Sequence, residues 1–535
     1  MPEPARFFNT AGPVNCADHY CLPPLERFDL ENVLTLIAQK KYFVLHAPRQ
    51  TGKTSCLLAL AEHLQRAGQY QPLYLNVEIA QSAREDVGAA MQAILGKLAA
   101  QTYTRLGNPV LNENWRLLLE KHGAHGALEA ALALWAESSS QPVVLMLDEI
   151  DALVGDTLIS VLRQLRAGYT NRPAGFPQSV ALCGVRDVRD YRIHSSREKA
   201  VITGGSAFNI KAESLRLGDF SRQEMEMLYR QHTDATAQAF SAEALSLAWE
   251  LTRGQPWLVN ALAYEACFKN KAGRDRSQTV SAEMFLQAKE NLIARRETHL
   301  DQLADKLREP RVRRVIEAIL VGRDAPEVMP EDDLQYVADL GLVRRKPEVE
   351  IANRIYQEII PRELTSVTQD MLAQNTLWYI RPDGRLDLDK LLSAFQQFFR
   401  EHSEHWVERF DYQEAGPQLL LQAFLQRVVN GGGRIEREYG LGRLRTDLLV
   451  LWPVNPADTR QPERQRVVIE LKILYGSLDR TLAQGLEQTW DYLDRCAAAE
   501  AHLIIFDRRA GRSWDEKIFR RVENYRGAAI KVWGM

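Results

Sequence analysis

A loop directly after the first strongly apolar run carries residues suited to binding phosphate. The segment APRQTGKT spans Ala47 to Thr54, between the run YFVLHA and the helical pattern SCLLALAEHLQRAG. A glycine lets the backbone approach an anion, a lysine neutralises its charge, and free N–H groups at a helix start bind phosphate oxygens. Such loops normally open with glycine, whose place Ala47 takes. The residues expected to contact a nucleotide are Ala47, Arg49, Gln50, Thr51, Gly52, Lys53, Thr54 and Ser55.

Two adjacent acids end another buried run and complete this chemistry. PVVLMLDEI places Asp148 and Glu149 after a strand pattern. With a phosphate loop upstream, Asp148 and the Thr54 hydroxyl are expected to hold Mg²⁺, and Glu149 to orient and deprotonate the attacking water. An isolated Asp-Glu pair is more often a solvated turn. The combination of the pair with the loop favours binding and hydrolysis of ATP.

Near the end of the chain, a second set of residues suits metal-assisted phosphodiester chemistry. Asp447 stands at the start of one strand pattern, in GRLRTDLLVLW, and Glu470 and Lys472 stand on the next, in VVIELKIL. Side chains alternate along a strand, so Glu470 and Lys472 are expected on one face, with Leu471 buried behind. This segment resembles the PD-(D/E)XK nuclease superfamily.

That resemblance implies a role for each residue. Asp447, Glu470 and the Leu471 carbonyl would bind one or two Mg²⁺ ions, or Mn²⁺, and Lys472 would position or activate the attacking water. Gln484 and Gln488 lie one turn apart in the helical pattern QGLEQTWDYLDR and would reach the metal or the phosphate. Glu438 would be the acid of a helix-to-strand approach.

The hydrophobic pattern predicts the elements that position these residues. Short apolar runs alternate with helical patterns in the first two hundred residues, which indicates a parallel sheet covered by helices on both faces. From Asp219 to about Glu309 only helical patterns occur. The segments RVRRVIEAIL, DDLQYVADLGLV and EVEIANRIYQEII then suggest a winged helix-turn-helix, whose arginines either contact phosphates or form a solvated face. The apolar runs are Tyr42 to Ala47, Pro72 to Val77, Pro142 to Ile150 and Ser179 to Val185.

Two further features refine the class of ATPase. Arg186 follows SVALCGV, where an AAA+-type ATPase places a polar sensor of the γ-phosphate, and RGQPWLVN carries Pro256 in a Gly-x-Pro arrangement. With the leader FFNTAGPVN…DHY, they resemble the STAND-type and archaeal-ATPase branch of AAA-like proteins. The resemblance implies that Pro256 helps the lid close on nucleotide and that His19 and Tyr20 lie near adenine. Arg186 as a loop ion-pair partner and Pro256 as a first-turn helix proline are the alternatives.

Together these patterns predict an α/β protein: a P-loop AAA-like ATPase with a helical lid, a winged helix and a C-terminal α/β PD-(D/E)XK nuclease-like domain. A chain of 535 residues is long enough for several domains. The expected divisions are a leader at 1–30, the ATPase core at 31–215, the lid at 216–304, the winged helix at 305–368, a helical linker at 369–410 and the nuclease-like domain at 411–535.

Composition sets limits on partners and surroundings. A formal net charge of −3 means that any nucleic-acid surface must be local. No apolar run is long enough to span a bilayer and no export signal is evident, so we expect a cytoplasmic protein without a membrane partner. Six scattered cysteines without a CxxC pair favour buried, reduced thiols over a zinc site at Cys16, His19 and Cys21.

The function that these features predict is a nucleotide-switched nuclease. ATP binding or hydrolysis would rearrange or assemble identical protomers and license Mg²⁺-dependent cleavage of DNA, with RNA left open as a substrate. The resemblance alone implies a role in prokaryotic defence or mobile-element conflict. Two other functions stay open: a non-cleaving ATP-switched regulator that binds nucleic acid or protein, and an ATP-dependent loader.

Overall fold

The computed structural model describes two compact units, each considered by itself. The first comprises Met1–Leu303 and Leu334–Tyr356, and the second Ala304–Asp333 and Gln357–Met535. The six-part division expected from the sequence is finer than these two units and stays a prediction. The residues described are 6–187, 192–195, 200–203, 208–295, 298–321, 330–345, 349–364, 379–407, 421, 424–425, 434–441, 444–454, 463–474, 476–507, 509 and 512–535.

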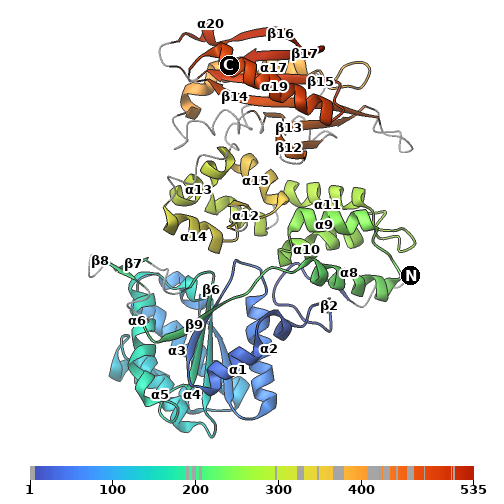
Figure 1. The fold of residues 1–535 in the computed structure, drawn as a ribbon. Helices are drawn as coiled ribbons and strands as arrows, with labels where there is room; N and C mark the ends of the chain where they lie inside the picture. Colours follow the sequence, from blue (N-terminus) through green and yellow to red (C-terminus); the bar gives the residue numbers. More distant parts are fainter. Residues whose placement is uncertain are drawn as a thin grey trace. The chain divides into compact units, whose positions relative to one another are not determined.

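A parallel sheet forms the centre of the first unit (Figure 1). It has five strands in the order β4-β5-β6-β3-β9. Four of its strands are those predicted from the apolar runs, and β9 extends the edge next to β3. A separate antiparallel pair, β7 (Arg192–Ser195) and β8 (Ala200–Thr203), was not predicted. The sheet strands are β3 (Tyr42–His46), β4 (Gln71–Asn76), β5 (Val143–Asp148), β6 (Ser179–Gly184) and β9 (Lys211–Arg216).

Helices cover both faces of this sheet, as the continuous apolar strands require. Tyr42 and Val44 of β3 pack in one core with α3, α4, α5 and α6. Phe43 and Leu45, the alternate residues, pack in the opposite core with α1 and α2. The helices are α1 (Leu30–Ala38), α2 (Lys53–Ala67), α3 (Val87–Leu106), α4 (Val110–His122), α5 (Ala127–Ser138) and α6 (Gly155–Ala167), with short 3₁₀ turns η1 (Pro24–Arg27), η2 (Glu78–Ala83), η3 (Ile150–Ala152) and η4 (Gly168–Asn171).

Between β9 and Leu303 the named elements of the first unit are helical, which confirms the change of pattern at Asp219. Serines cap three of these helices: Ser221, Ser241 and Ser281 each accept a hydrogen bond from a first-turn backbone N–H. The leader strands β1 (Phe7–Phe8) and β2 (His19–Tyr20) pair in parallel, and the rings of Phe8 and Tyr20 pack on Tyr229 and His232 of α8. The helical elements are α8 (Arg222–Thr236), α9 (Ala242–Thr252), α10 (Pro256–Tyr264), a π-helical turn η6 (Glu265–Lys269), α11 (Ala282–Ala294) and α12 (Thr298–Lys306).

The segment expected to form a winged helix has the predicted order of elements but is divided between the two units. Helix α13 (Pro310–Val321) falls in the second unit, whereas most of α14 (Glu331–Asp339) and the hairpin of β10 (Val343–Arg344) and β11 (Glu350–Ile351) fall in the first. Helix α15 (Arg354–Leu364) begins in the first unit. Arg344 pairs with Glu350 at 2.8 Å and Arg314 with Asp333 at 3.7 Å. DNA contact by these arginines stays a prediction.

The second unit contains a six-stranded mixed sheet in the order β12-β13-β14-β15-β17-β16. Strands β12, β13 and β14 are antiparallel neighbours, and β14, β15 and β17 run parallel. Glu438 lies within β12, so its prediction as part of a helix-to-strand approach is wrong; the segment instead extends the antiparallel sheet. The elements are α17 (Leu388–Val407), β12 (Arg434–Leu441), β13 (Leu444–Pro453), β14 (Arg464–Leu474), α19 (Leu478–Arg495), β15 (Glu500–Asp507), α20 (Trp514–Lys517), β16 (Phe519–Tyr525) and β17 (Ala528–Gly534).

The prediction of six reduced cysteines is wrong for two of them. Cys16 and Cys21 form a disulfide. The turn between β1 and β2 brings their Cα atoms to 5.4 Å, within the range that a disulfide bridges. Cys56, Cys183, Cys267 and Cys496 are buried thiols, as predicted. In the described parts of the chain, no helix has the length and apolar character to cross a membrane.

Candidate nucleotide site and a second acidic site

The phosphate loop joins the carboxyl end of β3 to the start of α2. Gly52 precedes α2 with a φ of 95°, a left-handed conformation that favours glycine. Lys53 Nζ donates to Ala47 O and Pro48 O, both at 2.9 Å, so its ammonium lies inside the turn of the loop. Ala47 is fully buried, and alanine at the position usually held by glycine therefore fits this loop.

The predicted magnesium ligands lie in direct contact. Thr54 Oγ1 donates to Asp148 Oδ2 at 2.7 Å, across 94 residues of sequence. Tyr74 OH, on β4, donates to the same carboxylate oxygen at 2.8 Å. Asp148 is fully buried at the end of β5. A buried carboxylate beside a hydroxyl in front of the phosphate loop has the oxygen ligands that Mg²⁺ prefers.

Glu149 and Asp151 lie beside this pair. Burial, followed by the negative charge of Asp148, raises the pKa of Glu149, and the positive charge of Lys53 opposes the rise. Asp151 is more strongly engaged, because its Oδ2 accepts the backbone N–H of Val185 at the end of β6. A raised pKa suits a general base, since the carboxylate then has a greater affinity for the proton of water.

Arg186 follows β6, as predicted, and it contacts α14 within the first unit. Its Nε lies 3.9 Å from Asp339 Oδ2, and its guanidinium lies 4.7 Å from the centre of the Tyr336 ring. Gly341, which follows α14, lies close to the loop as well, because a Cβ added there would stand 2.8 Å from Pro48. The ion-pair alternative therefore has a named partner, and the sensor role stays a prediction.

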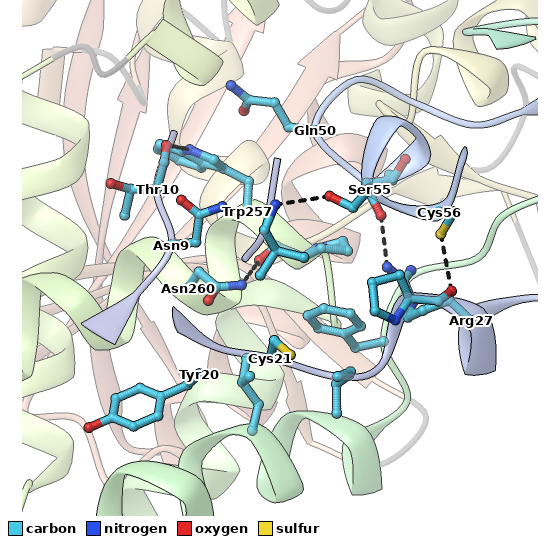
Figure 2. A pocket seen from close by; sticks show the side chains of 18 of the residues that line it. Asn9, Thr10, Tyr20, Cys21, Arg27, Gln50, Ser55, Cys56, Trp257 and Asn260 are labelled. Carbon is cyan, nitrogen blue, oxygen red and sulfur yellow. Dashed lines mark hydrogen bonds between the residues drawn. The ribbon is translucent and has the colours of Figure 1, made fainter. Parts of the chain in front are cut away.

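A cavity of about 130 Å³ adjoins the phosphate loop (Figure 2). Gln50, Thr51, Gly52 and Ser55 line it on the loop side, and Pro256 lines it from α10. Tyr20 of the leader also lines it, whereas His19 does not; the His19 ring instead packs edge-on against Phe7, with centroids 4.7 Å apart. Apolar lining from Leu22, Pro24, Cys56, Phe220, Leu228 and Trp257 suits a flat heterocycle.

Sequence reasoning missed two residues that organise this cavity. Arg27 donates to Thr51 O at 2.8 Å and to Gly218 O at 2.5 Å, and its guanidinium lies 4.5 Å from the centre of the Phe220 ring. Trp257 Nε1 donates to Thr10 O at 2.9 Å and so ties the leader to α10. Trp257 stands next to Pro256 in the quoted RGQPWLVN, which was a usable signal. Arg27 stands in no motif.

Comparison with known proteins supports the assignment of this unit. A protein-family model described as an AAA-like domain matches residues 25–360, more than half of the chain. The chain belongs to this AAA-like family. The matched residues contain the phosphate loop, Asp148, Glu149 and Pro256, so this part of the molecule is a P-loop ATPase-type domain. No curated protein matches the sequence.

Solved structures that are similar to part of this chain include three from archaea and bacteria. The AAA-like chain is 13% identical to a Walker-type ATPase of Pyrococcus abyssi, with a TM-score of 0.46, covering 66% of this chain and 99% of that one. It is 15% identical to Cdc6p of Pyrobaculum aerophilum, with a TM-score of 0.35, covering 66% of this chain and 96% of that one. It is 12% identical to the RuvB Holliday junction branch migration motor of Thermotoga maritima, with a TM-score of 0.31, covering 63% of this chain and 96% of that one.

The C-terminal acidic site lies beyond the AAA-like match. On β14, Val468 and Leu474 pack in a core with Leu486 and Tyr492 of α19. Alternation along the strand therefore places Glu470 and Lys472 on the face covered by α19. Lys472 Nζ lies 2.7 Å from Glu470 Oε1, and Glu470 is 3% exposed. Leu471, on the opposite face, is buried, as predicted.

The other predicted residues of this site are placed less completely. Asp447 belongs to β13, one residue before the pair Leu448↔Ile469 that joins β13 to β14; its side chain lies outside the described residues. Gln484 is exposed on α19, whereas Gln488 Oε1 is buried and, within the described chain, accepts no hydrogen bond. The predicted spacing of the two glutamines on one helix is confirmed.

A third cluster, of two acids and a histidine, is paired with neighbouring side chains. Asp389, Glu500 and His502 have ligand atoms within 4.8 Å of one another. Lys531 Nζ lies 2.9 Å from Asp389 Oδ1 and 2.7 Å from Glu500 Oε1, and Trp533 Nε1 donates to His502 Nδ1. These contacts occupy the groups that a metal would need, so the cluster is an ion-pair network.

Proposed function

We propose that this AAA-like protein binds and hydrolyses Mg²⁺-ATP and that its nucleotide state controls a C-terminal, metal-dependent DNA endonuclease. The ATPase part rests on two observations: Thr54 contacts Asp148, and the adjacent Lys53 holds its ammonium inside the phosphate loop. Lys53 would neutralise the β/γ-phosphates, Thr54 and Asp148 would hold Mg²⁺, and Glu149 would take the proton of the attacking water. The bound metal supplies charge neutralisation of the phosphates.

The nuclease part rests on the Glu470–Lys472 pair under α19. If the antiparallel register continues by one residue past Leu448↔Ile469, Asp447 would stand opposite Glu470. Two carboxylates that face each other on neighbouring strands suit a divalent metal. Lys472 would hold the attacking water or stabilise charge on the phosphate. Gln488 Oε1 is buried on α19 and accepts no hydrogen bond in the part of the chain that the structure describes, so it could accept one from a ligand.

One observation favours a non-cleaving regulator instead. Lys472 is in direct contact with a Glu470 oxygen, and that contact occupies an oxygen that a metal would need. In this alternative the ATPase is a switch, and the C-terminal unit binds nucleic acid or protein without cutting it.

Incubation of the purified protein with plasmid DNA separates these functions. The nuclease proposal expects cleavage that requires Mg²⁺ or Mn²⁺ and changes with added ATP, and EDTA should abolish it. Absence of metal-dependent cleavage across DNA and RNA substrates, with ATP present, would contradict the nuclease proposal and favour the regulator.

A further inference from the structure

Asn260 lines the cavity beside the phosphate loop and carries a buried acceptor that no group in the described part of the chain satisfies. Asn260 Nδ2, on α10, donates to Pro256 O at 2.8 Å (Figure 2). This bond sets the orientation of the amide, because a flipped amide would place the acceptor Oδ1 against the carbonyl oxygen of Pro256. Asn260 Oδ1 is buried and accepts no hydrogen bond within the described residues. Since an unsatisfied buried acceptor is unfavourable, Oδ1 is suited to a donor from a ligand.

Two other polar side chains that line the cavity, those of Asn9 and Ser55, are already engaged by the leader. Asn9 Nδ2 donates to Gly12 O at 3.0 Å, and its Oδ1 accepts from Ala11 N at 3.1 Å. Ser55 Oγ accepts from Val14 N at 3.0 Å. The Ser55 bond ties the leader to α2 beside the cavity. Among the described residues that line the cavity, Asn260 Oδ1 remains a buried side-chain acceptor for recognition of a base.

We propose that Asn260 selects adenine over guanine through its Oδ1, an inference that rests on the proposed binding of a nucleotide at the phosphate loop. Gln50, Thr51 and Gly52 line both the loop and the cavity, so phosphates on the loop place the attached base in the cavity. Adenine presents an amino group at C6, which donates, whereas guanine presents an oxygen there, which accepts. Guanine would therefore place its own acceptor oxygen against the acceptor Oδ1 of Asn260.

The test compares diphosphates, which the ATPase does not hydrolyse. Calorimetric titration gives the dissociation constants of ADP, GDP and purine riboside diphosphate, which lacks only the amino group of ADP. Wild type should bind ADP about tenfold more tightly than either of the other two, the usual size of one lost buried hydrogen bond. In Asn260→Leu, the ratio between ADP and purine riboside diphosphate should fall to about one.

Asn9→Ala is the matched control, because its amide lines the same cavity but is engaged by the leader. This variant should weaken all three ligands alike and keep the ratio of wild type. The role of Asn260 is overturned if wild type binds ADP and purine riboside diphosphate equally tightly while Lys53→Ala abolishes the binding of ADP. An unchanged ratio in folded Asn260→Leu overturns it as well. Binding that is absent, or unchanged in Lys53→Ala, overturns the nucleotide site itself and the inference with it.

Discussion

Lys53 is held by two carbonyl oxygens of its own loop, and its ammonium is the charge that compensates bound phosphates. Lys53→Ala should therefore abolish the thermal stabilisation by ATP and Mg²⁺. Wild type should gain about 2.7 kcal/mol when ligand stands at about a hundred times its dissociation constant. Thermal unfolding with and without nucleotide measures this, and Lys121→Ala, an exposed lysine on α4, is the control. An equal ATP-dependent shift in both variants would refute the phosphate-site assignment.

Glu149 is the second residue whose role follows from its surroundings. A base must be unprotonated, so hydrolysis by wild type should decline as pH falls through the raised pKa of Glu149. Glu149→Gln keeps the shape without the base and should retain ATP while turning it over at least about a hundredfold more slowly. Steady-state hydrolysis across pH measures both effects. Unchanged turnover in this variant, with loss in Asp151→Asn, would assign the base to Asp151.

At the scale of elements, the turn between α9 and α10 sets the position of Pro256 and Asn260. Gly254 has a φ of 81°, and a Cβ there would stand 1.8 Å from Phe220 O, so backbone would have to move. Gly254→Ala should destabilise the fold by at least about 2 kcal/mol and weaken nucleotide binding. Denaturant unfolding measures the loss. Gly218→Ala, where a Cβ meets nothing within 4 Å, should be close to neutral; equal stability of the two variants would contradict this account.

At the scale of the whole molecule, the two sets of chemical residues belong to different units, so their activities should be separable. Asp447→Ala, Glu470→Ala and Lys472→Ala should each reduce DNA cleavage by orders of magnitude while ATP hydrolysis continues. Cleavage and phosphate-release assays on the same preparations measure this. Glu487→Ala removes an exposed acid from α19 and should change neither activity. Full cleavage by the Asp447→Ala, Glu470→Ala double variant would place the nuclease site elsewhere.

Local pattern determined much of this protein. Buried strands with helices between them are visible in the sequence because continuous apolar runs reflect coverage on both faces. The phosphate loop, the acids that follow β5 and the alternation of Glu470 and Lys472 are likewise local, since a few neighbouring residues set each one.

Only the tertiary structure decided what distant residues do to one another. The link from Arg27 to Thr51 and the edge strand β9 depend on contacts between segments far apart in the chain, which no periodicity records. The Cys16–Cys21 disulfide depends on the path of the leader between the paired strands β1 and β2. That Asn260 Oδ1 accepts no hydrogen bond among the described residues is visible only in the tertiary structure, because an unmade hydrogen bond is a property of the packed cavity.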